Sequence, residues 1–147
     1  MPHKVDKSKL HPTDLRNPTS FPPYNDCPVE YDVDIDPDFY GDSEDSSIEP
    51  SGHWCFLAEV VEDLTLYLPR IVLGVRDKNS KYLRVAFYFD NKVEFDYSRV
   101  HVGNVIAVLY ARQHYFRDGS HGLRIEEPSH VKECAIHLCD RTCKKKL

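Results

Sequence analysis

The 147-residue sequence lacks any apolar run long enough to cross a membrane, which takes about 20 residues. Its first residues, MPHKVDKSKLHPTDLRNPTSFPPYNDC, also lack the apolar core of a secretory signal peptide. We therefore expect no membrane partner and an intracellular location, cytoplasmic or nuclear. In such a reducing compartment, cysteine thiols stay free or bind metal.

Motifs of the common enzyme classes are missing too. The sequence has no glycine-flanked nucleophile, no Walker-type phosphate loop and no HExxH zinc motif. Cys55 stands two positions after His53, and Ser120 is followed by His121, but the partners of a catalytic triad meet through the fold. We predict a non-enzymatic protein. An enzyme of unfamiliar type would instead need a deep pocket lined by convergent polar groups.

A dense basic patch, the usual footprint of a nucleic-acid-binding protein, is also lacking. Residues 1–50 carry four basic and twelve acidic side chains, a balance of −8. Residues 51–147 carry fifteen basic and twelve acidic side chains, a balance of +3. The overall charge of −5 therefore originates in the N-terminal third, and the remainder is close to neutral.

The N-terminal third has little apolar periodicity. Residues 1–28 are rich in proline, and acidic residues follow, so we predict that residues 1–50 form a mostly disordered arm. Apolar residues alternate with aspartates over 31–36, which is compatible with a short edge strand. These aspartates do not form a calcium loop, because Pro37 and Ser43 stand where glycine and glutamate are required.

From residue 51 onwards the sequence changes to short segments rich in β-branched and aromatic residues. Five segments are expected to be strands: 53–63, 68–77, 82–90, 104–116 and 123–136. The glycines of RDGSHG predict a hairpin turn before the last strand, which Pro128 interrupts. Asp96 is the expected N-cap of one helical turn between the third and fourth strands.

Five short strands with a helical turn after the third predict an all-β domain over residues 51–138, followed by a basic tail at 139–147. The pattern is typical of a small five-stranded Greek-key barrel of the OB type. An immunoglobulin-like sandwich stays open as the alternative, although it needs about seven strands.

Three of the five cysteines fall in the last fifteen residues, ECAIHLCDRTCKKKL. A structural zinc site needs four nitrogen or sulfur ligands. The candidate ligands are Cys134, His137, Cys139 and Cys143. They lie in one short segment, whereas most structural sites join two close pairs through a longer loop. We therefore expect no cofactor and leave zinc open, the alternative being a frayed basic end.

Two stretches, LGVRDKNSKYLRVAFYFD and VGNVIAVLYARQHYFRDGSHGLRIEEPSHV, resemble the N-terminal β domain of a group of fungal proteins that end in a MYND-type zinc finger. The resemblance covers roughly residues 53–131. It is carried chiefly by Tyr110, Ala111, His114, Phe116, Asp118, Gly119, Gly122, Arg124 and Glu126. It implies an adaptor with a two-zinc finger, but only the Cys139-x3-Cys143 spacing fits a ligand pair of such a finger. The finger is therefore expected to be absent or truncated.

Two binding functions follow. The main prediction is an interaction module for a protein partner, as the resemblance implies. The alternative is an OB-like domain that binds single-stranded nucleic acid by base stacking and phosphate contacts, against which the acidic arm argues. The candidate binding surface consists of Arg70, Arg76, Tyr82, Arg84, Tyr88, Arg112, His114 and Arg117. The oligomeric state stays open.

Overall fold

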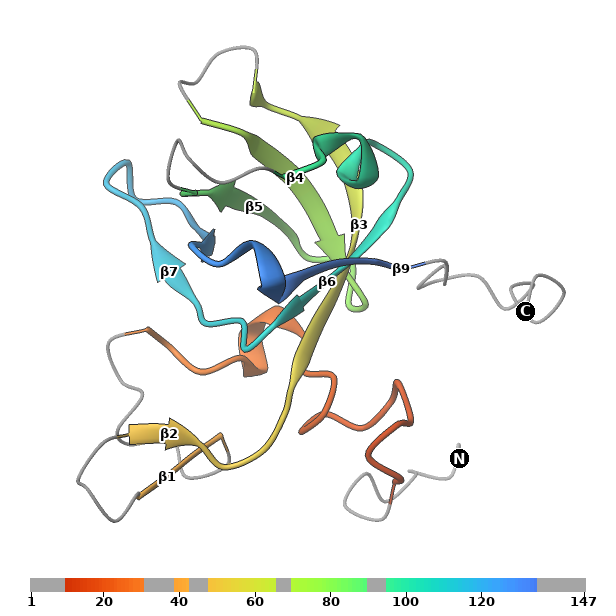
Figure 1. The fold of residues 1–147 in the computed structure, drawn as a ribbon, viewed down its shortest axis with the longest axis vertical. Coiled ribbons are helices and arrows are strands. Elements are labelled where there is room, and N and C mark those ends of the chain that lie inside the picture. The colour runs from red at the N-terminus through yellow and green to blue at the C-terminus, as the bar shows by residue number, and fades with distance from the viewer. Residues whose placement is uncertain (1–9, 31–38, 43–47, 66–69, 90–94, 135–147) are drawn as a thin grey trace, which may run out of the picture.

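The computed structural model describes residues 10–30, 39–42, 48–65, 70–89 and 95–134, and their fold is all-β (Figure 1). Within these residues the regular structure consists of strands and short 3-10 helices, without an α-helix. A small sheet pairs β1 (Tyr40–Asp42) with β2 (Ile48–Pro50). The remaining strands form one larger sheet.

The larger sheet has seven strands in the order β7-β8-β5-β4-β3-β6-β9. Their bounds are β3 Cys55–Asp63, β4 Val72–Asp77, β5 Tyr82–Phe87, β6 Val105–Leu109, β7 His114–Tyr115, β8 His121–Ile125 and β9 Val131–Cys134. Neighbouring strands are antiparallel except β5 and β8, which are parallel. The sheet is therefore mixed, which is consistent with an OB-type barrel.

The segment that contains β8 and β9 supplies strands near both ends of the sheet order. Strand β8 pairs with β5, and β9, which follows it along the chain, pairs with β6 on the far side. The 3-10 helix η6 (Pro128–His130) separates them, and Pro128, which has no N–H to donate to a ladder, occupies its first turn. Because two consecutive strands lie near opposite ends of the sheet order, the sheet curls on itself (Figure 1).

The predicted count of five strands is wrong in detail because two of the five predicted segments each divide into two strands. The last one divides at Pro128, as expected. The segment 104–116, predicted as one long strand, divides into β6 and β7. Tyr110 follows β6 with φ of 56°, a left-handed conformation that ends an extended strand.

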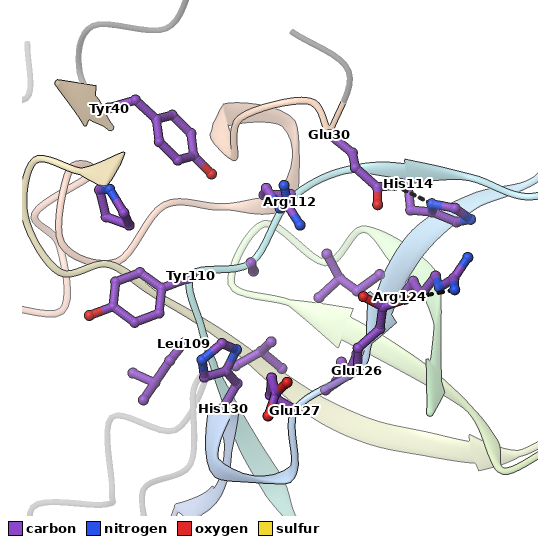
Figure 2. Close-up of a pocket in the computed structure, with 15 residues that line it drawn as sticks. Glu30, Tyr40, Leu109, Tyr110, Arg112, His114, Arg124, Glu126, Glu127 and His130 are labelled. Carbon is purple, nitrogen blue, oxygen red and sulfur yellow. Dashed lines mark hydrogen bonds and ion pairs between the residues drawn. The ribbon is translucent and has the colours of Figure 1, made fainter. Parts of the chain in front are cut away.

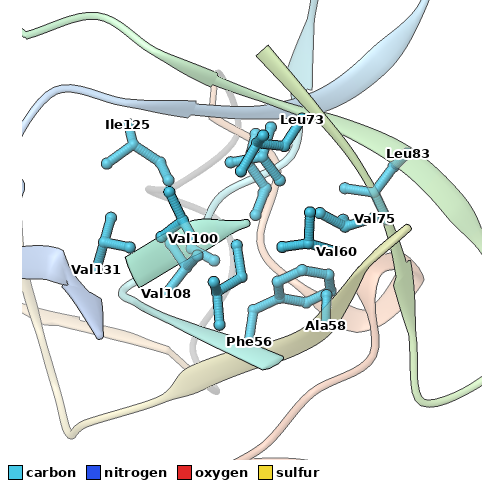
Figure 3. Close-up of a cluster of buried hydrophobic side chains, with 14 of the residues drawn as sticks. Phe56, Ala58, Val60, Leu73, Val75, Leu83, Val100, Val108, Ile125 and Val131 are labelled. Carbon is cyan, nitrogen blue, oxygen red and sulfur yellow. The ribbon is translucent and has the colours of Figure 1, made fainter. Parts of the chain in front are cut away.

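Four apolar side chains of β4 and β5 belong to the interior of the barrel, although burial does not simply alternate along β4, where Val72 is buried as well. Leu73 and Val75 of β4 and Leu83 and Val85 of β5 are buried, whereas Tyr82 is 45% exposed. They meet Phe56 and Val60 of β3 in one apolar cluster inside the barrel (Figure 3). The helical turn is confirmed as η5 (Tyr97–Val100), where the Asp96 side chain accepts a hydrogen bond from the Ser98 N–H.

The prediction of a mostly disordered arm is wrong for residues 10–30. The 3-10 helix η2 (Tyr24–Asp26) packs on the barrel, and Tyr24 is only 1% exposed. Pro22 and Pro28 are fully buried as well. The predicted edge strand over 31–36 lies outside the described residues. The composition of the arm predicted disorder because the arm cannot bury these residues by itself. The barrel supplies the apolar surface that buries them.

A buried carboxylate joins this arm to the β4–β5 turn. Asp77 is 5% exposed and accepts hydrogen bonds from the N–H groups of Tyr24 at 2.8 Å, Asn79 at 2.9 Å and Lys81 at 2.9 Å. The Tyr24 hydroxyl donates to the Gly122 carbonyl at 3.2 Å. Tyr24 therefore links the β4–β5 turn with β8, two parts of the barrel that are far apart in sequence.

Gly122 permits the parallel pairing of β5 with β8. A Cβ atom at this position would lie 2.0 Å from the Arg84 carbonyl oxygen and 2.9 Å from the Phe116 ring. Both distances are far inside van der Waals contact, so no other residue fits without moving the strands apart. Gly52, in contrast, has no atom within 4 Å of such a Cβ.

We predict that Gly122→Ala lowers the free energy of unfolding by about 1–3 kcal/mol, the usual cost of overpacking. Gly52→Ala, the matched control, should change it by less than about 0.5 kcal/mol. Urea denaturation followed by circular dichroism measures both. Equal stability of the two variants would contradict the close approach of β5 and β8.

We also predict a graded response at Tyr24. Tyr24→Phe removes one hydrogen bond and should cost about 0.5–1.5 kcal/mol. Tyr24→Ala empties a buried site and should cost about 3–5 kcal/mol. The same denaturation experiment tests this, and wild-type stability of Tyr24→Ala would mean that the arm does not belong to the core.

Candidate functional site

A groove with a volume of about 720 Å³ lies over β4, β5 and the β7–β8 hairpin. We call it the arginine groove because four arginines line it, against one carboxylate, that of Asp118. Its lining residues are Arg70, Val72, Arg84, Ala86, Tyr88, His114, Tyr115, Phe116, Arg117, Asp118 and Arg124. The groove thus combines several cations with several aromatic rings.

Two guanidinium groups lie over the Tyr88 ring in this groove. The Arg70 guanidinium carbon is 4.1 Å from the ring centroid and that of Arg124 is 4.3 Å away. The parallel register pairs Ala86 with Arg124, and the Tyr88 N–H donates to the Ile125 carbonyl at 2.8 Å. Each cation–π contact contributes roughly 0.5–2 kcal/mol, so the ring holds both arginines in place.

The floor of the groove is tied to the β7–β8 hairpin by an ion pair. Arg84 on β5 donates to the Asp118 carboxylate at 2.9 Å. The other carboxylate oxygen of Asp118 accepts from the Ser120 hydroxyl at 2.6 Å and the Ser120 N–H at 2.9 Å. These hydrogen bonds from Ser120, with the nearby Arg84 charge, lower the pKa of Asp118 to about 2. The carboxylate therefore stays charged at neutral pH.

The same hairpin carries aromatic rings toward the groove. Tyr115 is 45% exposed and packs edge-on against His121, with ring centroids 4.4 Å apart. Phe116 packs edge-on against His114 at 4.7 Å. Gly119 adopts φ of 86° in the turn, and the Phe116 N–H donates to the Ser120 carbonyl at 2.8 Å, which confirms the predicted hairpin.

A second pocket of about 530 Å³ adjoins the groove, and we call it the tyrosine pocket (Figure 2). His114 and Arg124 line both cavities. The other lining residues are Glu30, Tyr40, Pro50, Val108, Leu109, Tyr110, Ala111, Arg112, Leu123, Ile125, Glu126, Glu127 and His130. The boundary side chains are both paired with carboxylates: His114 with Glu30, and Arg124 with Glu126 at 2.6 Å.

Tyr110 stands in the wall of the tyrosine pocket in a strained backbone conformation. A left-handed φ at a non-glycine residue costs of order 1–3 kcal/mol. Its hydroxyl hydrogen-bonds to the His53 ring, and its own ring meets Trp54 edge-on at 5.2 Å and His130 at 5.5 Å. Trp54 is fixed in turn because its indole N–H donates to the Ala111 carbonyl at 2.9 Å.

The structure gathers most of the predicted binding surface but divides it. Arg70, Arg84, Tyr88, His114 and Arg117 line the arginine groove. Arg112 lines the tyrosine pocket, together with His114.

Arg76 and Tyr82 line neither cavity. The Tyr82 ring lies over Gly74, where a Cβ would come within 2.4 Å of its hydroxyl, and that hydroxyl donates to Glu62 at 2.7 Å. Arg76 is paired with Tyr82 in the antiparallel ladder of β4 and β5, at the C-terminal part of β4 and the first residue of β5. Tyr88 is covered by guanidinium groups, so it is not an open stacking platform, whereas Tyr82 is 45% exposed but lies outside both cavities.

Sequence reasoning missed Arg124 as a site residue. Its alternation with the buried Leu123 and Ile125 indicated an outward side chain. Only the parallel pairing of β5 with β8 puts it beside Tyr88, and no sequence pattern encodes that pairing.

The predicted zinc ligands lie almost entirely beyond the described residues. Cys134 ends β9, and His137, Cys139 and Cys143 follow outside the described range. Within the described part of the chain no group of three or more histidine, cysteine or acidic side chains is placed to hold a metal ion. The zinc site stays a prediction.

Ser120 and His121, which are adjacent in the sequence, do not contact each other as a catalytic pair would. The Ser120 hydroxyl donates to Asp118 and the His121 ring packs on Tyr115, so both side chains make contacts within the hairpin.

The sequence matches no protein-family model and no curated protein. Among solved structures, the chain is similar to Schizosaccharomyces pombe Pot1pC bound to ssDNA (CGGTTACGGT), with 14% identity, a TM-score of 0.44, and coverage of 65% of this chain and 87% of that one. It is also similar to the S. pombe Stn1-Ten1 complex, with 20% identity, a TM-score of 0.39, and coverage of 82% and 83%. These scores are too low to support a functional conclusion.

In the described part of the chain, no helix has the length and apolar character needed to span a membrane.

The Asp118 carboxyl offers a pH test of the hairpin. Because its pKa is lowered to about 2, Asp118 keeps its charge and its hairpin contacts from neutral pH downwards. These contacts are lost as the pH falls to about 2 and the carboxyl becomes protonated. We predict that Ser120→Ala raises the Asp118 pKa, because it removes the hydroxyl hydrogen bond that is the largest cause of the lowered value, and that Arg84→Ala raises it too. NMR titration of the side-chain carboxyl measures both, and an unchanged pKa in Ser120→Ala would contradict this geometry.

Proposed function

We propose that this chain is an OB-type barrel that binds single-stranded nucleic acid in the arginine groove. The first four strands of the barrel correspond to β3, β4, β5 and β6, and η5 lies between the third and the fourth. The segment that contains β8 and β9 corresponds to the fifth. OB barrels bind oligonucleotides over their second and third strands and at the loop between the fourth and fifth. The groove lies at this place, over β4, β5 and the β7–β8 hairpin.

The composition of the groove is the observation that carries the proposal. Single strands are held by cations that contact phosphates and by aromatic or guanidinium planes on which bases stack. The groove offers four arginines against one aspartate, and Tyr115 is substantially exposed at its hairpin. A base that stacks on an aromatic ring contributes about 1–3 kcal/mol.

The predicted mode of binding changes with the structure. Tyr88 supports binding indirectly, because its ring orients the guanidinium groups of Arg70 and Arg124. Guanidinium planes ordered in this way lose little further side-chain freedom when they contact a phosphate or a base. The hairpin ring of Tyr115 takes the stacking role that the sequence gave to Tyr82 and Tyr88.

This composition is our reason to prefer the nucleic-acid function over the protein partner that was the main prediction from sequence. The resemblance to fungal MYND-finger proteins, and with it an adaptor role, stays a prediction.

We predict salt-dependent binding of a labelled single-stranded oligonucleotide to the full chain, measured by fluorescence anisotropy. With three or four phosphate contacts, log K against log salt should have a slope of about −2 to −3. Arg70→Ala should weaken binding several-fold and flatten the slope by about 0.7. Arg76→Ala is the matched control, since it removes an exposed arginine of β4 that lies outside the groove.

Binding without salt dependence, or no binding at all, would overturn the proposal. An equal loss in Arg70→Ala and Arg76→Ala would show that the phosphates follow the sheet face and not the groove. Circular dichroism of each variant checks that the fold is intact.

A further inference from the structure

The two adjoining cavities differ sharply in charge. The arginine groove has four arginines and one aspartate, whereas the tyrosine pocket has Arg112 and Arg124 against Glu30, Glu126 and Glu127. A phosphate would be attracted to the first and repelled by the carboxylates of the second. A strand that fills the groove and continues past His114 and Arg124 would therefore present something other than phosphate to the pocket.

The walls of the tyrosine pocket suit a planar, polar ring. Tyr40 and Tyr110 line it, and both pack edge-on against the buried Trp54, at 5.4 Å and 5.2 Å. The strained backbone of Tyr110 keeps its ring in this wall (Figure 2). Strain of this kind persists where the surroundings over-determine it, and it clusters at ligand-binding positions.

Three carboxylates, which accept hydrogen bonds, line the pocket together with Arg112 and Arg124. Glu126 is held by Arg124, and Glu30 by His114. Glu127 is the N-cap residue of η6, but its side chain makes no capping hydrogen bond there. Figure 2 shows Glu127 beside His130 at the pocket, and Glu127 is exposed, so a ligand can reach its carboxylate.

We propose that the tyrosine pocket is a base-selective subsite, which takes one base carrying an exocyclic amino group from the strand that the arginine groove binds. This inference rests on the function proposed above. An ionised carboxylate only accepts hydrogen bonds. The N4 amino group of cytosine donates to it, whereas uracil presents the O4 acceptor at the same position and is repelled.

The test compares oligo-dC with oligo-dU of equal length on the full chain at neutral pH. These strands have the same backbone and ring size and differ at position 4, an amino group against a carbonyl, and at N3, an acceptor against an N–H donor. We expect oligo-dC to bind about tenfold more tightly. Glu127→Gln, whose amide can donate to uracil O4 as well as accept from cytosine N4, should remove most of this preference, chiefly by strengthening oligo-dU binding. Glu133→Gln, an exposed glutamate on β9 outside the pocket, is the matched control and should retain the preference.

Trp54, the only tryptophan of the chain, gives a second readout because it contacts both tyrosines of the wall. Oligo-dC should change its fluorescence more than oligo-dU does at saturation. If both strands bind equally and Glu127→Gln changes nothing, the base subsite is refuted and the arginine groove stands. If neither strand binds, the proposed function fails first.

Discussion

The parallel contact between β5 and β8 at Gly122 is the constraint on which the rest of the molecule depends. The Arg84 carbonyl oxygen lies so close to Gly122 that a Cβ there would be 2.0 Å away. This approach sets the register that places Arg124 beside Ala86 and hence over Tyr88. It also offers the Gly122 carbonyl to the Tyr24 hydroxyl, so the arm, the barrel and the arginine groove meet at one glycine.

How much of this was predictable follows from the range of the interactions concerned. Strand composition, turn glycines and caps are local signals, so the segments that contain β4 and β5 could be predicted, as could the turn at Gly119 and the cap at Asp96. Strand pairing is not local, and the parallel neighbour of β5 comes from a segment about 40 residues later. The position of Arg124 in the site depends on that pairing, which is why the sequence placed candidate residues on the sheet face but not in a groove.

The proline-rich arm shows a second limit, because composition describes whether a segment can bury itself and not whether another surface can bury it. Proline has no N–H to leave unsatisfied, so a buried Pro22 or Pro28 costs less polar desolvation than another residue would. The N–H groups that do enter the interface are satisfied: that of Tyr24 by Asp77, and that of Cys27 by the Pro23 and Tyr24 carbonyls. A composition typical of disorder is thus compatible with a fixed position against the barrel.

The placement of charge explains how an acidic chain can hold an arginine groove. Each groove arginine with a described carboxylate partner is paired through one edge of its guanidinium group: Arg84 with Asp118 and Arg124 with Glu126. A guanidinium group has five N–H donors, so a single carboxylate leaves others for a ligand. These pairs fix the orientation of the arginines at their exposed ends while Tyr88 supports Arg124 from its ring face. Under the proposed function, the carboxylates therefore act less as competitors for phosphate than as groups that position the cations before a strand binds.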